Sequence, residues 1–339
     1  MIIRRTRSHL ALLATVAAVA APGCTLEKSD DVSEYREALP EASNVRVAGP
    51  ESGSGGERTQ AGAGAALLAD GATEGEGTAE WYRFTRNVRD GVNLVTAGVL
   101  GSVWFVVHTR PTTVGESYAE WGPYKDALDP VTWRLRVERV ADHEYDYRLE
   151  GRPRASDSED DYLTVLEGKG YGRADARHGD GHFVVDLDAQ RTLDPDRHGD
   201  DAGTLTITHD LPASSRRKLG ALPRAITAVI DPPGDAELTI VSNADEDGSG
   251  RLDVSGRVDV DESKQTALED VAIVSRFRAD GAGRADVVIG AGDVPEELGA
   301  LSVSECWGSD FFRTYYADSV EASPTEGDPS ACVYEASDP

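Results

Sequence analysis

The sequence predicts a mainly β protein in which a long antiparallel meander, forming a curled or barrel-like sheet, packs against one long helix near the N-terminus. Apolar residues recur at steps of three and four from Trp81 to Val106, which is the period of a helix. From residue 116 to 307, apolar and polar residues alternate instead, and clusters of turn residues separate the runs. Strands and helices do not alternate along the chain, which argues against a parallel sheet.

The first 23 residues have the pattern of an export signal. Three arginines precede an uncharged run over residues 10–21, which has the length of a signal-peptide core and is too short to span a bilayer. We therefore expect residues 1–23 to be removed from the mature chain.

The end of this signal, Ala-Pro-Gly-Cys at residues 21–24, resembles the lipobox of bacterial lipoproteins. In those proteins the cysteine receives diacylglycerol and becomes the first mature residue, so the resemblance implies that Cys24 is lipidated and incorporates palmitate. Cleavage after residues 18–20, Ala-Val-Ala, is the alternative and would leave Cys24 as a free thiol. Thr25 replaces the aspartate that retains enteric lipoproteins in the inner membrane. We therefore expect an outer-membrane lipoprotein whose body faces the periplasm or the cell surface.

The chain is strongly acidic, with a formal net charge of −27 at pH 7. Removal of residues 1–23 makes it more acidic, because that segment contains three arginines and no acidic residue. Such a field repels nucleic-acid phosphates and anionic lipid head groups, which excludes nucleic-acid binding, and it favours cations or basic partners. The remaining chain of about 316 residues is long enough for one large β domain.

Three cysteines in an exported protein leave one without a partner if the other two pair. Lipidation of Cys24 accounts for the odd one, and Cys306 and Cys332 are then expected to form a disulfide in an oxidising compartment. Two reduced, buried thiols are the alternative.

Residues 24–77 are rich in Gly, Ala, Ser, Glu and Asp, a composition that buries too little apolar surface to fold. We expect this segment to be a flexible tether between the lipid and the body, with a short helix near residues 30–39. Residues 78–339 are predicted to form a single large β domain that begins with the long helix and ends in a disulfide-tied segment.

The long helix is predicted from about residue 78 to 108, with Thr78 as its N-cap and an end before Pro111. Residues 91–107 carry no charge, so we expect this half to be buried on all sides against the apolar face of the sheet. A transmembrane span is the rival interpretation, but the run is short, and glycines and polar residues interrupt it. The predicted buried residues are Val95, Val99, Val103, Trp104 and Val107. If a gap separates helix and sheet, the first four would face a ligand.

Two alternating runs within residues 131–150 predict a hairpin. For their apolar residues to share one face, Val137 must lie near Tyr147, and this places Arg134 opposite Glu150 on the other face. An odd-length loop satisfies this register. Further strands are predicted at residues 162–171, 181–188, 203–209, 224–230, 236–242, 251–260, 270–278, 285–290 and 301–306.

The sequence contains no catalytic motif for acyl, phosphoryl or hydride transfer, so no catalytic residue is predicted. Only the loop at residues 243–254 suggests a metal. Its candidate ligands to a structural Ca²⁺ are Asn243, Asp245, Asp247 and Ser249. The twelfth position, where calcium loops place a bidentate glutamate, is Val254. A hairpin turn is the alternative explanation for the same residues.

Four segments together resemble a group of uncharacterised bacterial secreted lipoproteins. They are EWYRFTRNVRDGVN at 80–93, WGPYKDALDPVTWRL at 121–135, ECWGSDFFRTYYADS at 305–319 and SACVYE at 330–335. The resemblance implies export and this order of elements, and it carries no activity, ligand or site residue.

We therefore expect a non-enzymatic lipoprotein of the outer membrane with a structural or interaction role. One rival is a carrier for a lipid or another apolar ligand, which an apolar cavity of several hundred Å³ would favour. The other is a hydrolase built on carboxylates, which a convergent acidic pair in a cleft would favour. The expected partners are the membrane, through the anchor, and either an apolar ligand or a protein.

Overall fold

The computed structural model describes residues 30–50, 77–125, 129–171, 180–199, 201–211, 223–260, 267–320 and 326–339. The predicted signal peptide 1–23, the predicted lipidation site Cys24 and residues 51–76 of the predicted tether lie outside the described residues.

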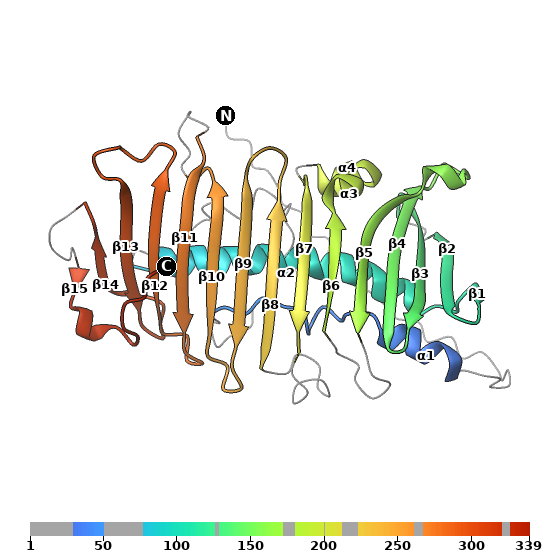
Figure 1. The fold of residues 1–339 in the computed structure, drawn as a ribbon, viewed down its shortest axis with the longest axis horizontal. Helices are drawn as coiled ribbons and strands as arrows, with labels where there is room; N and C mark the ends of the chain where they lie inside the picture. The colour runs from blue at the N-terminus through green and yellow to red at the C-terminus, as the bar shows by residue number, and fades with distance from the viewer. Residues whose placement is uncertain are drawn as a thin grey trace, which may run out of the picture.

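The described residues form one antiparallel sheet of 15 strands in which every strand pairs with its neighbours in chain order (Figure 1). The first and last strands are the two edges, so the sheet is open and is not a closed barrel. The predicted mainly β class and long meander are confirmed. The strands are β1 Thr113–Val114, β2 Tyr118–Lys125, β3 Val131–Ala141, β4 Glu144–Pro153, β5 Leu163–Tyr171, β6 Gly181–Asp186, β7 Thr204–Asp210, β8 Arg224–Asp231, β9 Glu237–Ala244, β10 Gly250–Val258, β11 Glu269–Phe277, β12 Gly283–Ala291, β13 Ala300–Trp307, β14 Arg313–Asp318 and β15 Glu326–Gly327.

The β3–β4 hairpin has the predicted register. Val137 pairs with Tyr147, and Arg134 pairs with Glu150, to which its guanidinium forms an ion pair at 3.0 Å. The turn is shorter than expected, because only residues 142–143 separate the two strands. A β-bulge near the end of β3 supplies the extra residue that keeps both apolar sets on one face.

The long helix, α2 Glu80–Val107, crosses the strands on one face of the sheet (Figure 1). It contacts β12 and β13 near its start and β2 and β3 near its end. The helix has 28 residues and is therefore about 42 Å long. The predicted N-cap is wrong. Ala79 is the N-cap and makes no side-chain capping bond, while Thr78 forms an isolated β-bridge with Phe312. The end of the helix falls before Pro111, as predicted.

A second element lies on the same face of the sheet, beside α2 (Figure 1). It consists of two parts, α1 Asp30–Glu37 and residues 38–50. We call residues 38–50 the N-terminal strap. Val47 in the strap exchanges two hydrogen bonds with the Asn93 side chain of α2, at 2.8 and 3.0 Å. Ala48 donates to the Ser242 hydroxyl of β9 at 2.8 Å.

The short helix predicted near residues 30–39 is therefore present, but the expectation of a flexible tether is wrong for residues 30–50. Five of their apolar side chains, which a composition dominated by polar and small residues obscures, are almost fully buried. They are Tyr35, Leu39, Val45, Val47 and Ala48. Burial against α2 and the sheet supplies the stabilisation that the segment could not provide alone.

Two short helices, α3 Leu187–Leu193 and α4 Pro195–His198, follow β6. Ala189 and Leu193 of α3 pack on Val131 and Val165 from the sheet. Two 3-10 turns, η2 Glu159–Asp161 and η3 Pro329–Ala331, complete the described elements. The predicted disulfide is confirmed: Cys306 in β13 is bonded to Cys332 just after η3, with Cα atoms 5.4 Å apart.

Candidate functional site

The uncharged half of α2 is buried on one side only. Val99 and Val103 are 4% and 2% exposed, as predicted, and Val95 is partly buried against the core. Trp104, which was predicted to be buried, is 58% exposed, so the expectation of burial on all sides is wrong. The physical reason is that the sheet and the strap together cover less than the circumference of the helix. The exposed positions are Ala97, Gly98, Gly101, Trp104 and Phe105.

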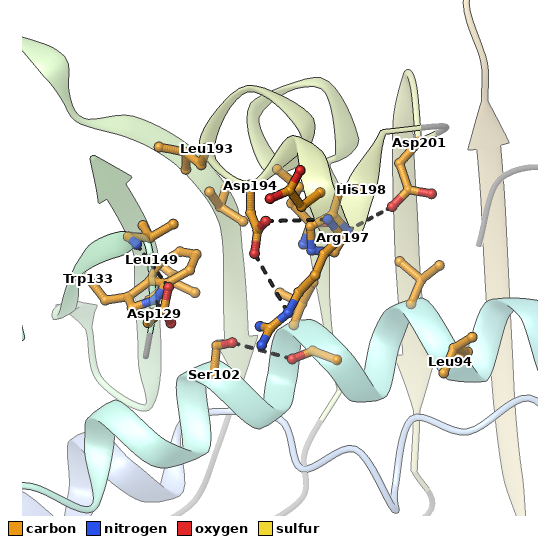
Figure 2. A pocket seen from close by; sticks show the side chains of 17 residues that line it. Leu94, Ser102, Asp129, Trp133, Leu149, Leu193, Asp194, Arg197, His198 and Asp201 are labelled. Carbon is orange, nitrogen blue, oxygen red and sulfur yellow. Dashed lines mark hydrogen bonds and ion pairs between the residues drawn. The ribbon is translucent and has the colours of Figure 1, made fainter. Parts of the chain in front are cut away.

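An open groove lies on each side of this exposed face. The first groove, of about 410 Å³, runs between α2, strands β3 to β5 and the α3–α4 pair (Figure 2). The second groove, of about 460 Å³, runs between α2, the end of α1 and the strap. Gly98 and Ser102 line the first groove, and Gly101 and Trp104 line the second. The four residues predicted to face a ligand are divided between the grooves: Val95 and Val99 line the first, and Val103 and Trp104 line the second. Whether they face a ligand stays a prediction.

The first groove has an apolar floor. Trp133, Leu149, Val165 and Leu193 contribute to it, and Val95 and Val99 of α2 form its wall. The indole N–H of Trp133 donates to Asp129 Oδ2 at 2.9 Å. Asp129 Oδ1 in turn accepts from the backbone N–H of Val131 at 2.9 Å, so the indole ring is held in a fixed orientation.

The rim of the first groove is charged and comes from α3 and α4 (Figure 2). Asp194 caps α4 by accepting from the Arg197 backbone N–H at 3.3 Å, and its carboxylate also lies 3.7 Å from the Arg197 side chain. The His198 ring nitrogen Nδ1 lies 2.8 Å from Asp201 Oδ2, and Asp201 is only 2% exposed. The rim thus carries one guanidinium and one imidazole, each paired with a carboxylate, together with the further carboxylates of Asp129 and Asp196.

This rim was missed at the level of the sequence, because α3 and α4 are too short for a periodic pattern to stand out. The signals that could have located them are capping residues. Asp186 accepts from the backbone N–H of Ala189 at the start of α3, and Asp194 followed by Pro195 starts α4.

Three of the carboxylates at the first groove have structural hydrogen-bond partners. Asp129, Asp194 and Asp201 each accept a hydrogen bond that fixes the surrounding structure. Among the described residues, no group of three or more His, Cys, Asp or Glu side chains is placed to hold a metal ion.

The candidate calcium ligands lie in the β9–β10 hairpin, as the alternative explanation held. Asn243 is in β9 and pairs with Arg251. Ser249 donates through its hydroxyl and its backbone N–H to Asp247 Oδ1, at 2.6 and 2.8 Å, and its hydroxyl also reaches Asp245 at 3.4 Å. These bonds lower the pKa of Asp247. The side chains are therefore engaged in holding the turn.

No family model, curated protein or solved structure matches this chain. What the two grooves can bind is therefore inferred from their own residues. The helix α2 is long and apolar enough to cross a membrane by length and composition, but 44% of its most apolar window is buried inside the protein. That burial, with the packing of α2 on β2, β3, β12 and β13, favours the core-helix interpretation over a transmembrane span.

Proposed function

We propose that the protein is a non-enzymatic outer-membrane lipoprotein that binds an apolar or amphipathic chain, such as the acyl chain of a lipid, in the first groove. The observation that carries this proposal is the groove of about 410 Å³ with an apolar floor beside the uncovered face of α2. Its volume falls within the range of about 300 to 1,000 Å³ that is typical of small-molecule sites.

The distribution of charge suits an amphipathic ligand. Val95 and Val99 with the Trp133 ring would contact the apolar chain, while a polar head group would lie at the rim beside Arg197 and His198. A ligand in this orientation buries carbon and leaves its charge in water, which avoids the cost of burying an unpaired charge.

The proposed location rests on the sequence. The signal peptide and Cys24 support a lipid anchor, and the Cys306–Cys332 disulfide supports export to an oxidising compartment. The order of segments that resembles secreted lipoproteins supports the same location. Replacing Cys24 by Ser should release the protein into the soluble fraction and abolish incorporation of labelled palmitate.

The ligand can be tested with the mature chain carrying Cys24→Ser and a fluorescent 16-carbon fatty acid. Gly98 and Gly101 form a matched pair, because a Cβ built at either position meets nothing within 4 Å, so larger side chains fit without distorting the helix. Gly98→Leu projects into the first groove and should weaken binding of the probe at least about tenfold, by 1.4 kcal/mol or more. Gly101→Leu projects into the second groove and should leave binding unchanged.

The outcomes separate the candidate functions. Lack of probe binding by the unsubstituted chain, together with lipid-free extracts of protein purified from its own membrane, would contradict the proposal and favour a structural or docking role. Equal loss of binding in both glycine variants would place the ligand elsewhere along α2.

A further inference from the structure

The C-terminal end of α2 exposes aromatic side chains. Trp104 and Phe105 are 58% and 43% exposed. The Phe105 ring packs edge-on against Tyr124 of β2 with centroids 5.0 Å apart, and the Trp104 ring lies 4.2 Å from that of His108. We call Trp104, Phe105 and Tyr124 the aromatic end. Large exposed apolar groups gathered in one place on a strongly acidic protein indicate an interaction surface.

The helix α1 is fixed beside the aromatic end. The Arg36 guanidinium donates to the carbonyl oxygens of Val107 and Thr109, at 3.0 and 3.1 Å, and so ties the last turn of α1 to the last turn of α2. Arg36 and Trp104 both line the second groove. The chain therefore enters the described structure at the same end of the molecule that exposes the aromatic side chains.

The length of the preceding chain limits how far this end can lie from the anchor. Only five residues, 25–29, separate Cys24 from the first residue of α1, Asp30. A fully extended chain spans at most about 3.5 Å per residue, so α1 begins within about 20 Å of Cys24. The start of α2, about 42 Å from its end, lies at the β12–β13 side of the sheet. An anchor at Cys24 thus favours contact between the membrane and the aromatic end over contact with the start of α2.

We propose that the aromatic end rests on the surface of the phospholipid bilayer that holds the Cys24 lipid, with Trp104 and Phe105 among the lipid head groups. This inference rests on the anchoring at Cys24 that is part of the proposed function. Tryptophan favours this depth, because its ring is apolar and its N–H remains bonded to water or head groups. Arg110 is exposed just beyond α2, and a long basic side chain at a membrane surface can extend to lipid phosphates. Both grooves then lie beside the lipid from which an acyl chain could come.

Tryptophan fluorescence can test this contact with the lipidated full-length protein, reconstituted into phosphatidylcholine vesicles with and without bromine on the acyl chains. Bromine quenches only nearby indoles. Trp121 and Trp307 are 0% and 1% exposed and are therefore shielded. Trp133 lines the first groove, so all the proteins compared carry Trp133→Phe. We expect quenching in this parent protein, loss of most of it when Trp104→Phe is added, and full quenching in the matched control with Trp81→Phe at the opposite end of α2.

Each outcome bears on one part of the inference. Protein that floats with the vesicles and carries palmitate, but shows no quenching, would overturn the bilayer contact and leave the anchor in place. Quenching retained in Trp104→Phe would overturn it as well, because another indole would then face the lipid. Protein that neither floats nor incorporates palmitate would overturn the anchor and, with it, the inference.

Discussion

The two halves of α2 are held in opposite ways. In the N-terminal half, the fully buried Glu305 of β13 accepts from the backbone N–H groups of Glu80 and Trp81, at 3.0 and 2.6 Å. One turn later the hydroxyls of Thr85 and Ser275 are hydrogen-bonded at 2.6 Å. The C-terminal half, which carries no charge, leaves one face in contact with solvent and with two grooves.

Hydropathy led us to expect that the uncharged half would be buried on all sides, and the structure shows the reverse. The half with charged residues is fixed from several sides, whereas the uncharged half is the one that remains uncovered. An apolar composition indicates that a surface is poorly solvated, but it does not indicate which group covers that surface. The covering group can be a sheet, a ligand or a lipid surface, and in this molecule the sheet covers only one side.

The largest expected effect is a difference in the free energy of unfolding between substitutions at two adjacent residues of the uncharged half. Val103→Asp places a charge without a partner against the sheet and should lower the free energy of unfolding by several kcal/mol, about 4 or more. Trp104→Asp, one residue later, points away from the sheet and should cost less than about 1 kcal/mol. Urea unfolding of both variants measures the difference. Similar losses in the two would contradict one-sided burial.

The second prediction concerns the fixed half. Burial raises the pKa of Glu305, and the Trp81 N–H, Arg313 and the Glu80 N–H offset part of this effect. Glu305→Ala removes the shared acceptor, so two backbone donors lose a partner and Arg313 loses its buried one. We expect a loss of about 3 to 5 kcal/mol, the range for breaking a buried pair.

The exposed Glu326 is the matched control for Glu305, because its carboxylate approaches the same arginine, Arg313, at 3.7 Å and is 53% exposed. Glu326→Ala should cost at most about 1 kcal/mol, as for other surface ion pairs. Equal unfolding free energies for the two alanine variants would show that Glu305 does not anchor the helix.

The contrast also shows which contacts a sequence can reveal. The register that pairs Arg134 with Glu150 could be predicted because both strands and their turn lie close together in the chain, between Val131 and Pro153. The cap of α2 could not, because Glu305 lies 225 residues from Glu80 and is one of 61 acidic residues. The strap and the rim formed by α3 and α4 were missed for a related reason. Their burial depends on surfaces that exist only once the sheet and α2 are assembled.

The third prediction extends the fixed half to the C-terminus. Cys306 follows Glu305 in β13, so the disulfide to Cys332 ties the last segment to the strand that caps α2. It closes a loop of 26 residues, and Cys332→Ala should cost about 3 kcal/mol in the chain-entropy model. Reductant should lower the stability of the unsubstituted protein to that of the variant. A variant that is still sensitive to reductant would contradict this assignment.

The smallest expected effect compares two glycines of α2, one on its buried face and one on its uncovered face. Gly91 is buried, so the methyl group of Gly91→Ala should crowd its neighbours and lower the free energy of unfolding by about 1 kcal/mol. Gly98→Ala adds the same methyl group over the first groove, where it meets nothing within 4 Å, and should raise the free energy of unfolding by about 0.5 to 1 kcal/mol. Calorimetry of the two variants checks the opposite signs, and a shift of the same sign in both would mean that the two faces of the helix are packed alike. A stabilising Gly98→Ala would also show that the glycine at this position lowers the stability of the helix. The open space that it leaves at the groove is what the proposed ligand binding requires.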